Sequence, residues 1–206
     1  MDEPRTLVVY VVDDDPAVRD SLSLLLSLKG YNTKCFASAQ DFLASARAGM
    51  AGCIMADVRM PGMSGLEMQE ELQRRAIELP VVVITAHGSV AAARRAFKAQ
   101  AVDFLEKPFD EDGPVQAVEA AFARERMRLA SLQAMERKTR LLSSLTTRER
   151  QVVSLLVRGL HHAQIGDELG ISPRTIEVHK ARIMAKLGIR SVAELVQVAL
   201  DPPPKG

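Results

Sequence analysis

Five short apolar segments in the first half of the chain constrain its fold more than any other feature. They read TLVVYVV, NTKCF, GCIMA, PVVVITA and AVDFLE, and they begin at residues 6, 32, 52, 80 and 101. Each is followed by turn residues and then by a stretch with helical spacing. Strands that are almost continuously apolar are buried on both faces, and strands that alternate with helices form parallel sheets. The pattern therefore predicts an α/β fold over residues 1–123, with a doubly wound, five-stranded parallel sheet.

Polar side chains stand where these predicted strands end. In a doubly wound sheet, ligands bind at the carboxyl ends of the strands. The residues delivered to that edge are Asp13, Asp14, Asp15, Asp57, Thr85 and Lys107. Carboxylates that lie together raise one another's pKa and repel unless a hard cation joins them, which favours Mg²⁺ or another small divalent cation. One carboxylate is then free to act as a nucleophile, whereas Asp15 directly precedes Pro16 and is interpreted as a helix cap.

The charge of the chain divides into two unlike halves. Residues 1–123 carry 12 Lys and Arg against 18 Asp and Glu, whereas residues 124–206 carry 15 against 8. The acidic half suits a cation site and the basic half suits a polyanion. Two cysteines without disulfide or metal spacing are expected to be buried, reduced thiols. No apolar run approaches the roughly 18 residues that span a bilayer, and the acidic start is no targeting signal, so we expect a cytoplasmic protein with no membrane partner.

The second half of the chain reads as helical throughout. Residues 124–144 predict a helical linker, because no strong helix breaker follows Pro114 until about Leu142. Residues 145–206 predict an all-α domain of four short helices, with a helix-turn-helix around the turn LGIS. In the third of these helices Ile176, Ile183 and Leu187 share the inner face. The residues of the opposite face are Arg174, Glu177, Val178, Ala181 and Arg182.

Four motifs in the first half, VVDDDP, DVRMPGMSG, ITAHG and LEKPF, resemble in order and spacing the flavodoxin-like receiver domain of two-component response regulators. The resemblance implies that Asp57 accepts a phosphoryl group from a sensor histidine kinase and that the Lys107–Pro108 bond is cis. The ligands that it assigns to Mg²⁺ are Asp13, Asp14, Asp57 and the backbone carbonyl of Arg59. The residues that it assigns to the phosphoryl group and the conformational switch are Thr85, Lys107 and Phe104. A receiver assists only its own phosphorylation and dephosphorylation, so the chain is not expected to be an enzyme.

The strings LTTRERQVV and GISPRTIEVHKARIMAKLGIRSVAELV resemble the LuxR-type DNA-binding domain over residues 145–200. Together with the receiver, they resemble response regulators of the NarL and FixJ group, and the wording SPRTIEVH is most similar to the FixJ branch. The resemblance implies that the third helix enters the major groove, where Glu177 can accept a hydrogen bond from a cytosine amino group and Val178 can contact a thymine methyl group. The full set of expected DNA contacts is Arg174, Thr175, Glu177, Val178, Lys180, Arg182 and Lys186, of which the last three suit phosphates.

These features together predict a phosphorylation-controlled transcriptional regulator. Its expected partners are a sensor histidine kinase, promoter DNA, a second copy of the chain that pairs through SVAAARRAFKAQAVDF, and RNA polymerase if it activates transcription. One alternative is a phosphorylation-gated protein-interaction module, which leaves the basic half unexplained. Another is a magnesium-dependent phosphatase of the haloacid dehalogenase type, whose D-x-D-x-[TV] motif is not matched by DDDPA.

Overall fold

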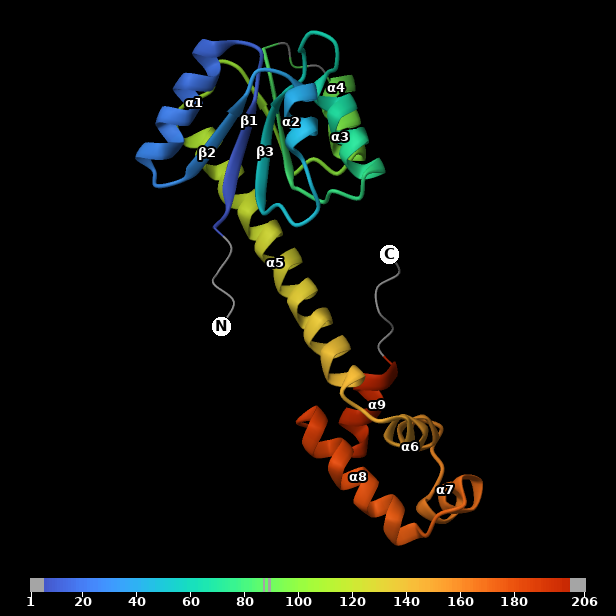
Figure 1. Cartoon of the computed structure of the whole chain (residues 1–206). Coiled ribbons are helices and arrows are strands. Elements are labelled where there is room, and N and C mark those ends of the chain that lie inside the picture. The colour runs from blue at the N-terminus through green and yellow to red at the C-terminus, as the bar shows by residue number, and fades with distance from the viewer. Residues whose placement is uncertain (1–5, 87, 89, 201–206) are drawn as a thin grey trace. The chain divides into compact units, whose positions relative to one another are not determined.

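The computed structural model describes residues 6–86, 88 and 90–200, and it divides the chain into two compact units (Figure 1). The first unit comprises residues Met1–Leu129 and the second comprises Ala130–Gly206. Within the described ranges, no helix is both long enough and apolar enough to cross a membrane.

The first unit is built on the predicted five-stranded parallel sheet. Its strands are β1 (Val8–Val12), β2 (Asn32–Phe36), β3 (Gly52–Asp57), β4 (Val81–Thr85) and β5 (Asp103–Glu106). They lie in the order β2-β1-β3-β4-β5, and every pair is parallel. The register aligns Asp57 with Ile84 and Thr85 with Glu106, so the polar residues that end the strands meet at one edge.

Five helices cover the two faces of this sheet. They are α1 (Pro16–Leu28), α2 (Ala39–Ser45), α3 (Gly65–Arg74), α4 (Val90–Lys98) and α5 (Asp112–Ser143). The expected start of α1 is confirmed, because Asp15 accepts a hydrogen bond from the Ala17 N–H at 2.9 Å. Ser64 and Glu67 form a capping box at the start of α3, which stabilises a helix by satisfying its free N–H groups.

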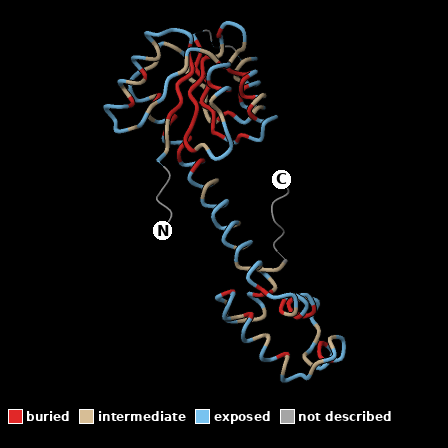
Figure 2. The backbone as a smooth tube through the Cα atoms, in the orientation of Figure 1, coloured by how far each residue is buried: buried red, intermediate tan, exposed pale blue. Residues whose placement is uncertain are grey.

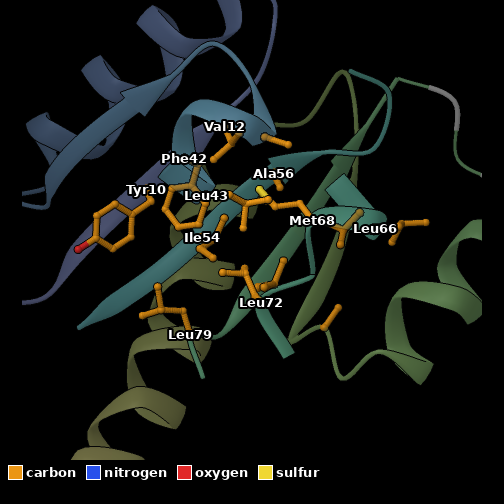
Figure 3. Close-up of a cluster of buried hydrophobic side chains, with 14 of the residues drawn as sticks. Tyr10, Val12, Phe42, Leu43, Ile54, Ala56, Leu66, Met68, Leu72 and Leu79 are labelled. Atoms are coloured by element: carbon orange, nitrogen blue, oxygen red, sulfur yellow. The ribbon is translucent and has the colours of Figure 1, made fainter. Parts of the chain in front are cut away.

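Two apolar layers hold these helices to the sheet. One face carries α2, α3 and α4 over a cluster that includes Tyr10, Phe42, Ile54 and Met68 (Figure 3). The other face carries α1 and the first part of α5 over residues such as Leu22 and Phe122. The three central strands β1, β3 and β4 are accordingly the most deeply buried part of the unit (Figure 2).

The two cysteines differ in burial. Cys53 on β3 is fully buried as expected, and burial raises the pKa of its thiol to about 12. Cys35 is exposed, so the expectation of a second buried thiol is wrong. The reason is topological, because β2 is an edge strand and each of its five residues is exposed or only partly buried.

Helix α5 continues past the predicted domain boundary at residue 123. Its buried residues end at Glu125, which has no exposed surface and is held by the Arg128 guanidinium through hydrogen bonds of 2.7 and 2.8 Å. This glutamate therefore belongs to the packing of the first unit, although it lies within the predicted linker, and the rest of α5 is mostly exposed (Figure 2).

The second unit contains α6 (Thr147–Val157), α7 (His162–Leu169), α8 (Pro173–Leu187) and α9 (Val192–Leu200). Thr146 and Glu149 form a capping box at the start of α6, and the Ser191 hydroxyl accepts a hydrogen bond from the Glu194 N–H at the start of α9. Its core includes Ile165, Ile176, Ile183, Leu187 and Leu195, which confirms the predicted inner face of α8.

Candidate functional site

The carboxyl edge of the sheet gathers buried polar residues from three neighbouring strands and the end of β5. Asp13 follows β1 and is 1% exposed, Asp57 ends β3 and is 6% exposed, and Thr85 ends β4 and is buried. Lys107 follows β5, and its Nζ lies 2.6 Å from Asp13 Oδ2 and 2.8 Å from Asp57 Oδ1. The structure therefore brings together four of the residues that the sequence predicted as a site.

Backbone and side-chain donors fix the two carboxylates from the protein side. The Arg59 N–H donates to Asp57 Oδ2 at 2.6 Å, and the Asp15 N–H donates to Asp13 Oδ1 at 2.9 Å. The Arg19 guanidinium also donates to the backbone oxygen of Asp13 at 2.6 Å. Each carboxylate thus has one oxygen tied to the backbone and the other tied to Lys107.

Burial and charge act in opposite directions on the ionisable groups of this edge. Burial raises the pKa of Asp13, and the hydrogen bond from Lys107 only partly opposes it. Burial also lowers the pKa of Lys107, but the hydrogen bonds and negative charges of Asp13 and Asp57 outweigh it, and the net shift is upward. Lys107 is therefore an ammonium ion at neutral pH, where it neutralises two buried acids.

The loop after β5 aims Lys107 into the site. The Lys107–Pro108 bond is cis, as the resemblance implied, and the Lys107 N–H donates to the Thr85 oxygen at 2.7 Å. Phe104, the expected switch residue, is partly buried and packs against the apolar cluster under α2, α3 and α4. It stands on the same strand that delivers Lys107.

Gly65 is a residue of this site whose role sequence reasoning missed. A Cβ at this position would lie 2.3 Å from the backbone oxygen of Asp57, so only glycine lets α3 begin this close to the acid. The motif DVRMPGMSG contains Gly65. Its role depends on a contact between two elements, and no local pattern reports such a contact.

The two buried carboxylates suit a hard divalent cation, because Mg²⁺ prefers oxygen ligands. Asp14, the third acid of the predicted set, is exposed. Within the described residues, no group of three or more His, Cys, Asp or Glu is arranged to hold a metal ion. Lys107 therefore bridges Asp13 and Asp57, and the carboxylate oxygens of these two acids are suitable ligands for Mg²⁺.

The second unit presents the predicted outer face of α8 to solvent. Arg174, Glu177, Val178 and Arg182 are exposed, and Thr175 and Lys180 are partly exposed. In His179, the ring Nδ1 is buried and has no hydrogen-bond partner within the described part of the chain. Its partial burial agrees with the interpretation that His179 lies toward the inner face.

Lys186 differs from the other expected DNA contacts, because its ammonium bonds within the unit. Its Nζ donates to Glu149 Oε2 at 2.6 Å and to the Ser144 oxygen at 3.4 Å. Glu149 is buried, and the hydrogen bonds from Lys186 and the Thr146 N–H lower its pKa to about 2. Lys186 therefore has a structural partner in addition to any phosphate that it contacts.

The first unit has a five-stranded parallel sheet with two buried aspartates and a lysine at its carboxyl edge, and a helix-turn-helix unit follows it. These features define a class of protein in which a phosphoacceptor receiver is coupled to a DNA-binding domain. Family models agree, since residues 9–119 match the response regulator receiver domain and residues 143–199 match the luxR family of bacterial regulatory proteins.

Individual relatives extend the similarity to the whole chain. The transcriptional regulatory protein FixJ of Azorhizobium caulinodans is 44% identical over 96% of this chain and 93% of its own. The solved response regulator StyR is 43% identical with a TM-score of 0.85, covering 94% of this chain and 98% of its own. Full-length FixJ from B. japonicum is 39% identical with a TM-score of 0.59, covering 96% and 97%. The chain belongs to the two-component response regulators of the FixJ group, and it is a phosphorylation-controlled transcriptional regulator.

Proposed function

We propose that Asp57 is the residue at which a sensor histidine kinase phosphorylates this regulator, and that α8 then reads promoter DNA. The observation that carries the proposal is the Asp57 carboxylate, which is buried at the ligand-binding edge of the sheet with a lysine ammonium 2.8 Å away. A carboxylate that merely capped a helix would not need this cation. Asp15 already caps α1, and Ser64 caps α3.

The geometry supports nucleophilic attack by an Asp57 oxygen on phosphorus. The bond from phosphorus to the donor's imidazole nitrogen breaks as the new bond forms, and an acyl phosphate results. The Arg59 N–H holds one oxygen of Asp57 in place during this step. Before the transfer, Lys107 neutralises the Asp57 carboxylate. After it, the lysine can pair with an oxygen of the phosphoryl group. Thr85 and Phe104 then respond to this group as the conformational switch.

Mg²⁺ would be held by Asp13, Asp14, Asp57 and the carbonyl of Arg59, and it would neutralise the phosphoryl oxygens when bound. Asp13 contributes a buried carboxylate whose Oδ1 is fixed by the Asp15 N–H. Because Asp13 Oδ2 accepts a hydrogen bond from Lys107, this oxygen would serve as a metal ligand only if the lysine released it. Asp14, at the exposed edge of the pair, would supply its carboxylate from the solvent side.

On the DNA side, we propose that Glu177 and Val178 contact base edges while Lys180 and Arg182 contact phosphates. Arg174 and Thr175 at the start of α8 and Lys186 at its end complete the predicted set. The exposure of Glu177, Val178 and Arg182 supports this assignment. Such a regulator acts in the bacterial cytoplasm, where its DNA lies, and it contacts RNA polymerase if it activates. We propose that the only reactions at this site are the phosphorylation and dephosphorylation of the regulator itself.

Phosphoryl labelling tests the proposal directly. Acetyl phosphate with Mg²⁺ is expected to add one phosphoryl group to the full chain, measured by intact mass, and Asp57→Ala is expected to abolish the addition. Asp15→Asn is the matched control, because asparagine also caps helices and the residue lies at the same edge. Labelling that persists in Asp57→Ala would refute the assignment, and sustained release of inorganic phosphate would favour the phosphatase alternative.

A further inference from the structure

The first unit contains a cavity of about 600 Å³ at the edge of the sheet opposite to the phosphorylation site. It lies where β4 begins, beside Pro80 and Val81, whereas Asp57 stands at the carboxyl end of β3. The ends of α3 and α4 and the middle of α5 form its other sides. Pockets that bind small molecules have volumes of about 300–1,000 Å³. The cavity therefore has the size of a ligand site, and the proposed phosphoryl transfer does not use it.

Part of the wall of this cavity is apolar. Leu72 of α3 and Leu79 of the following loop line it, and both belong to the buried cluster under α2, α3 and α4 (Figure 3). Ile77 and Val81 line it as well. An apolar group that moves from water onto such a wall is stabilised by the hydrophobic effect. The wall can therefore hold the hydrocarbon part of a ligand.

The wall also contains a buried hydrogen-bond acceptor without a donor. Gln69 of α3 is 4% exposed, and its Nε2 donates to the Ala99 backbone oxygen at 2.7 Å. Its Oε1 has no hydrogen-bond partner among the described residues. Gln73 Nε2 donates to the same Ala99 oxygen at 2.8 Å, so that oxygen keeps a donor if Gln69 turns toward a ligand. A buried acceptor without a donor is unfavourable, which favours a ligand with an N–H or O–H group.

Two cations at the rim of the cavity have no acid partner. Lys98 ends α4, Arg124 lies on α5, and both side chains line the cavity. Arg124 donates to the backbone and side-chain oxygens of Gln100 at 3.2 and 3.4 Å, and these acceptors are uncharged. Within the described part of the chain, neither cation forms an ion pair. Both are therefore available to an anion from solution.

The other charged groups at the cavity are already paired. Arg128 bonds the buried Glu125 at 2.7 Å, and Glu78 lies 3.9 Å from the same guanidinium. With Lys98 and Arg124 included, the cavity has three cations against two carboxylates, and the unpaired charges are positive. A guanidinium matches the geometry of a carboxylate and can bind both of its oxygens. The charges thus favour a carboxylate as the anionic group of a ligand.

We propose that this cavity binds a small organic carboxylate that has an apolar body and one N–H or O–H donor. Its carboxylate pairs with Lys98 and Arg124, its body lies on Leu72 and Leu79, and its donor bonds Gln69 Oε1. Because α3, α4 and α5 all contribute, the bound ligand joins three helices and stabilises the first unit against unfolding. The inference is independent of phosphoryl transfer, which takes place at the other edge of the sheet.

Amide-resolved NMR titration of the full chain tests the proposal. The probes are para-hydroxyphenylacetate, indoleacetate and N-acetylleucine, each of which has a carboxylate, an apolar body and one donor. At least one probe is expected to bind at millimolar concentration or below and to shift the amides around Gln69, Ala99 and Arg124. For a probe that binds, the analogue without the donor and the uncharged amide analogue are each expected to bind about tenfold more weakly.

Variants of the chain separate a contact with the ligand from a change in the fold. Lys98→Gln and Arg124→Gln are each expected to weaken the carboxylate probe about tenfold and to leave the uncharged analogue unaffected, because only the charge contact is lost. Arg94→Gln is the control, since Arg94 also lies on α4 but does not line the cavity. In Gln69→Leu, which has no acceptor, the probe is expected to bind no better than its donor-free analogue. Thermal unfolding checks that each variant is folded.

Three results would overturn the inference. If no probe shifts these amides at millimolar concentration, Lys98 and Arg124 serve only to stabilise the carboxyl end of α4, where cations are favourable. If Arg124→Gln weakens the carboxylate and the uncharged analogue alike, the charge of Arg124 does not recognise the ligand. Shifts centred on the edge that carries Asp57 would place the probe at the phosphorylation site instead.

Discussion

At the scale of single residues, this chain contains two lysine–carboxylate pairs that have different roles. Lys107 joins two buried acids at the carboxyl edge of the sheet, where we propose that it exchanges one of them for the phosphoryl group. Lys186 joins Glu149 inside the second unit, where the carboxylate also accepts a hydrogen bond from the Thr146 N–H of a helix cap. We therefore expect the first pair to exchange partners and the second to stabilise the fold.

The Glu149 pair predicts a pH dependence of stability. Its folded pKa of about 2 lies below the ordinary 4.5, so its contribution is complete above pH 4.5 and is lost as pH falls toward 2. Glu149→Gln keeps a residue suited to the capping box but cannot titrate. Urea unfolding of the full chain, followed by circular dichroism from pH 6 to pH 3, is expected to show a flatter decline for the second unit in this variant. Identical pH profiles would contradict the ion-pair role.

Lys180 and Lys186 give a paired prediction for DNA binding. Lys180→Ala is expected to weaken binding to all sequences alike and to reduce the slope of log affinity against log salt by about one. Lys186→Ala leaves Glu149 without its cation, and it is expected to lower the unfolding free energy of the second unit by about 1 kcal/mol or more. Salt-titrated binding to random duplex DNA and thermal unfolding separate the two effects. A flat salt dependence in the wild type would favour the protein-interaction alternative.

At the scale of elements, the start of α3 is placed by a contact rather than by helix propensity. Gly65 is the first residue of the helix, and the backbone of Asp57 occupies the space that a side chain would need. An alanine ordinarily stabilises a helix by about 1 kcal/mol relative to glycine. Here the close approach must reverse that preference, because α3 would be pushed away from the end of β3.

Gly65→Ala is therefore expected to lower the unfolding free energy of the first unit by about 1–3 kcal/mol and to slow phosphoryl labelling of Asp57. Gly113→Ala is the control, because its added Cβ, near the start of α5, would meet side chains alone, the nearest being Asp110 at 3.2 Å. Chemical unfolding and labelling rates are measured for both variants. Equal effects of the two substitutions would show that the contact with Asp57 is unimportant.

At the scale of the whole molecule, we expect phosphorylation to act through a change of structure. About two added negative charges are screened within roughly 8 Å at physiological salt, so their direct effect is confined to groups near the site. Helix α4 exposes Val90 (80%) and Phe97 (52%), a surface suited to a second copy of the chain. Arg95 of this helix is engaged by Glu70 of its own chain at 2.9 Å.

We expect the phosphorylated chain to be dimeric and to bind paired DNA sites more tightly, because dimerisation raises the effective concentration of the second reading head. Asp57→Ala is expected to stay mainly monomeric with acetyl phosphate. Phe97→Arg is expected to accept the phosphoryl group normally but not to dimerise. Sedimentation with and without phosphodonor measures both variants, and an unchanged oligomeric state in the wild type would point to release of an inhibitory contact between the domains.

The sequence alone determined the order of strands and helices, the caps at Asp15 and Thr146, and the residues that the strands deliver to one edge. These follow from local propensity and from periodicity, which act over a few neighbouring residues. Four motifs in register also determined the family, and with it the cis bond before Pro108.

Only the tertiary structure decided which charged groups meet. It brought Lys107 between two acids, Lys186 to Glu149, and Glu125 into the packing of the first unit. It also exposed Cys35 on an edge strand. These outcomes depend on how close side chains that are far apart in the sequence come in space. Packing sets that separation, and a local sequence pattern does not report it.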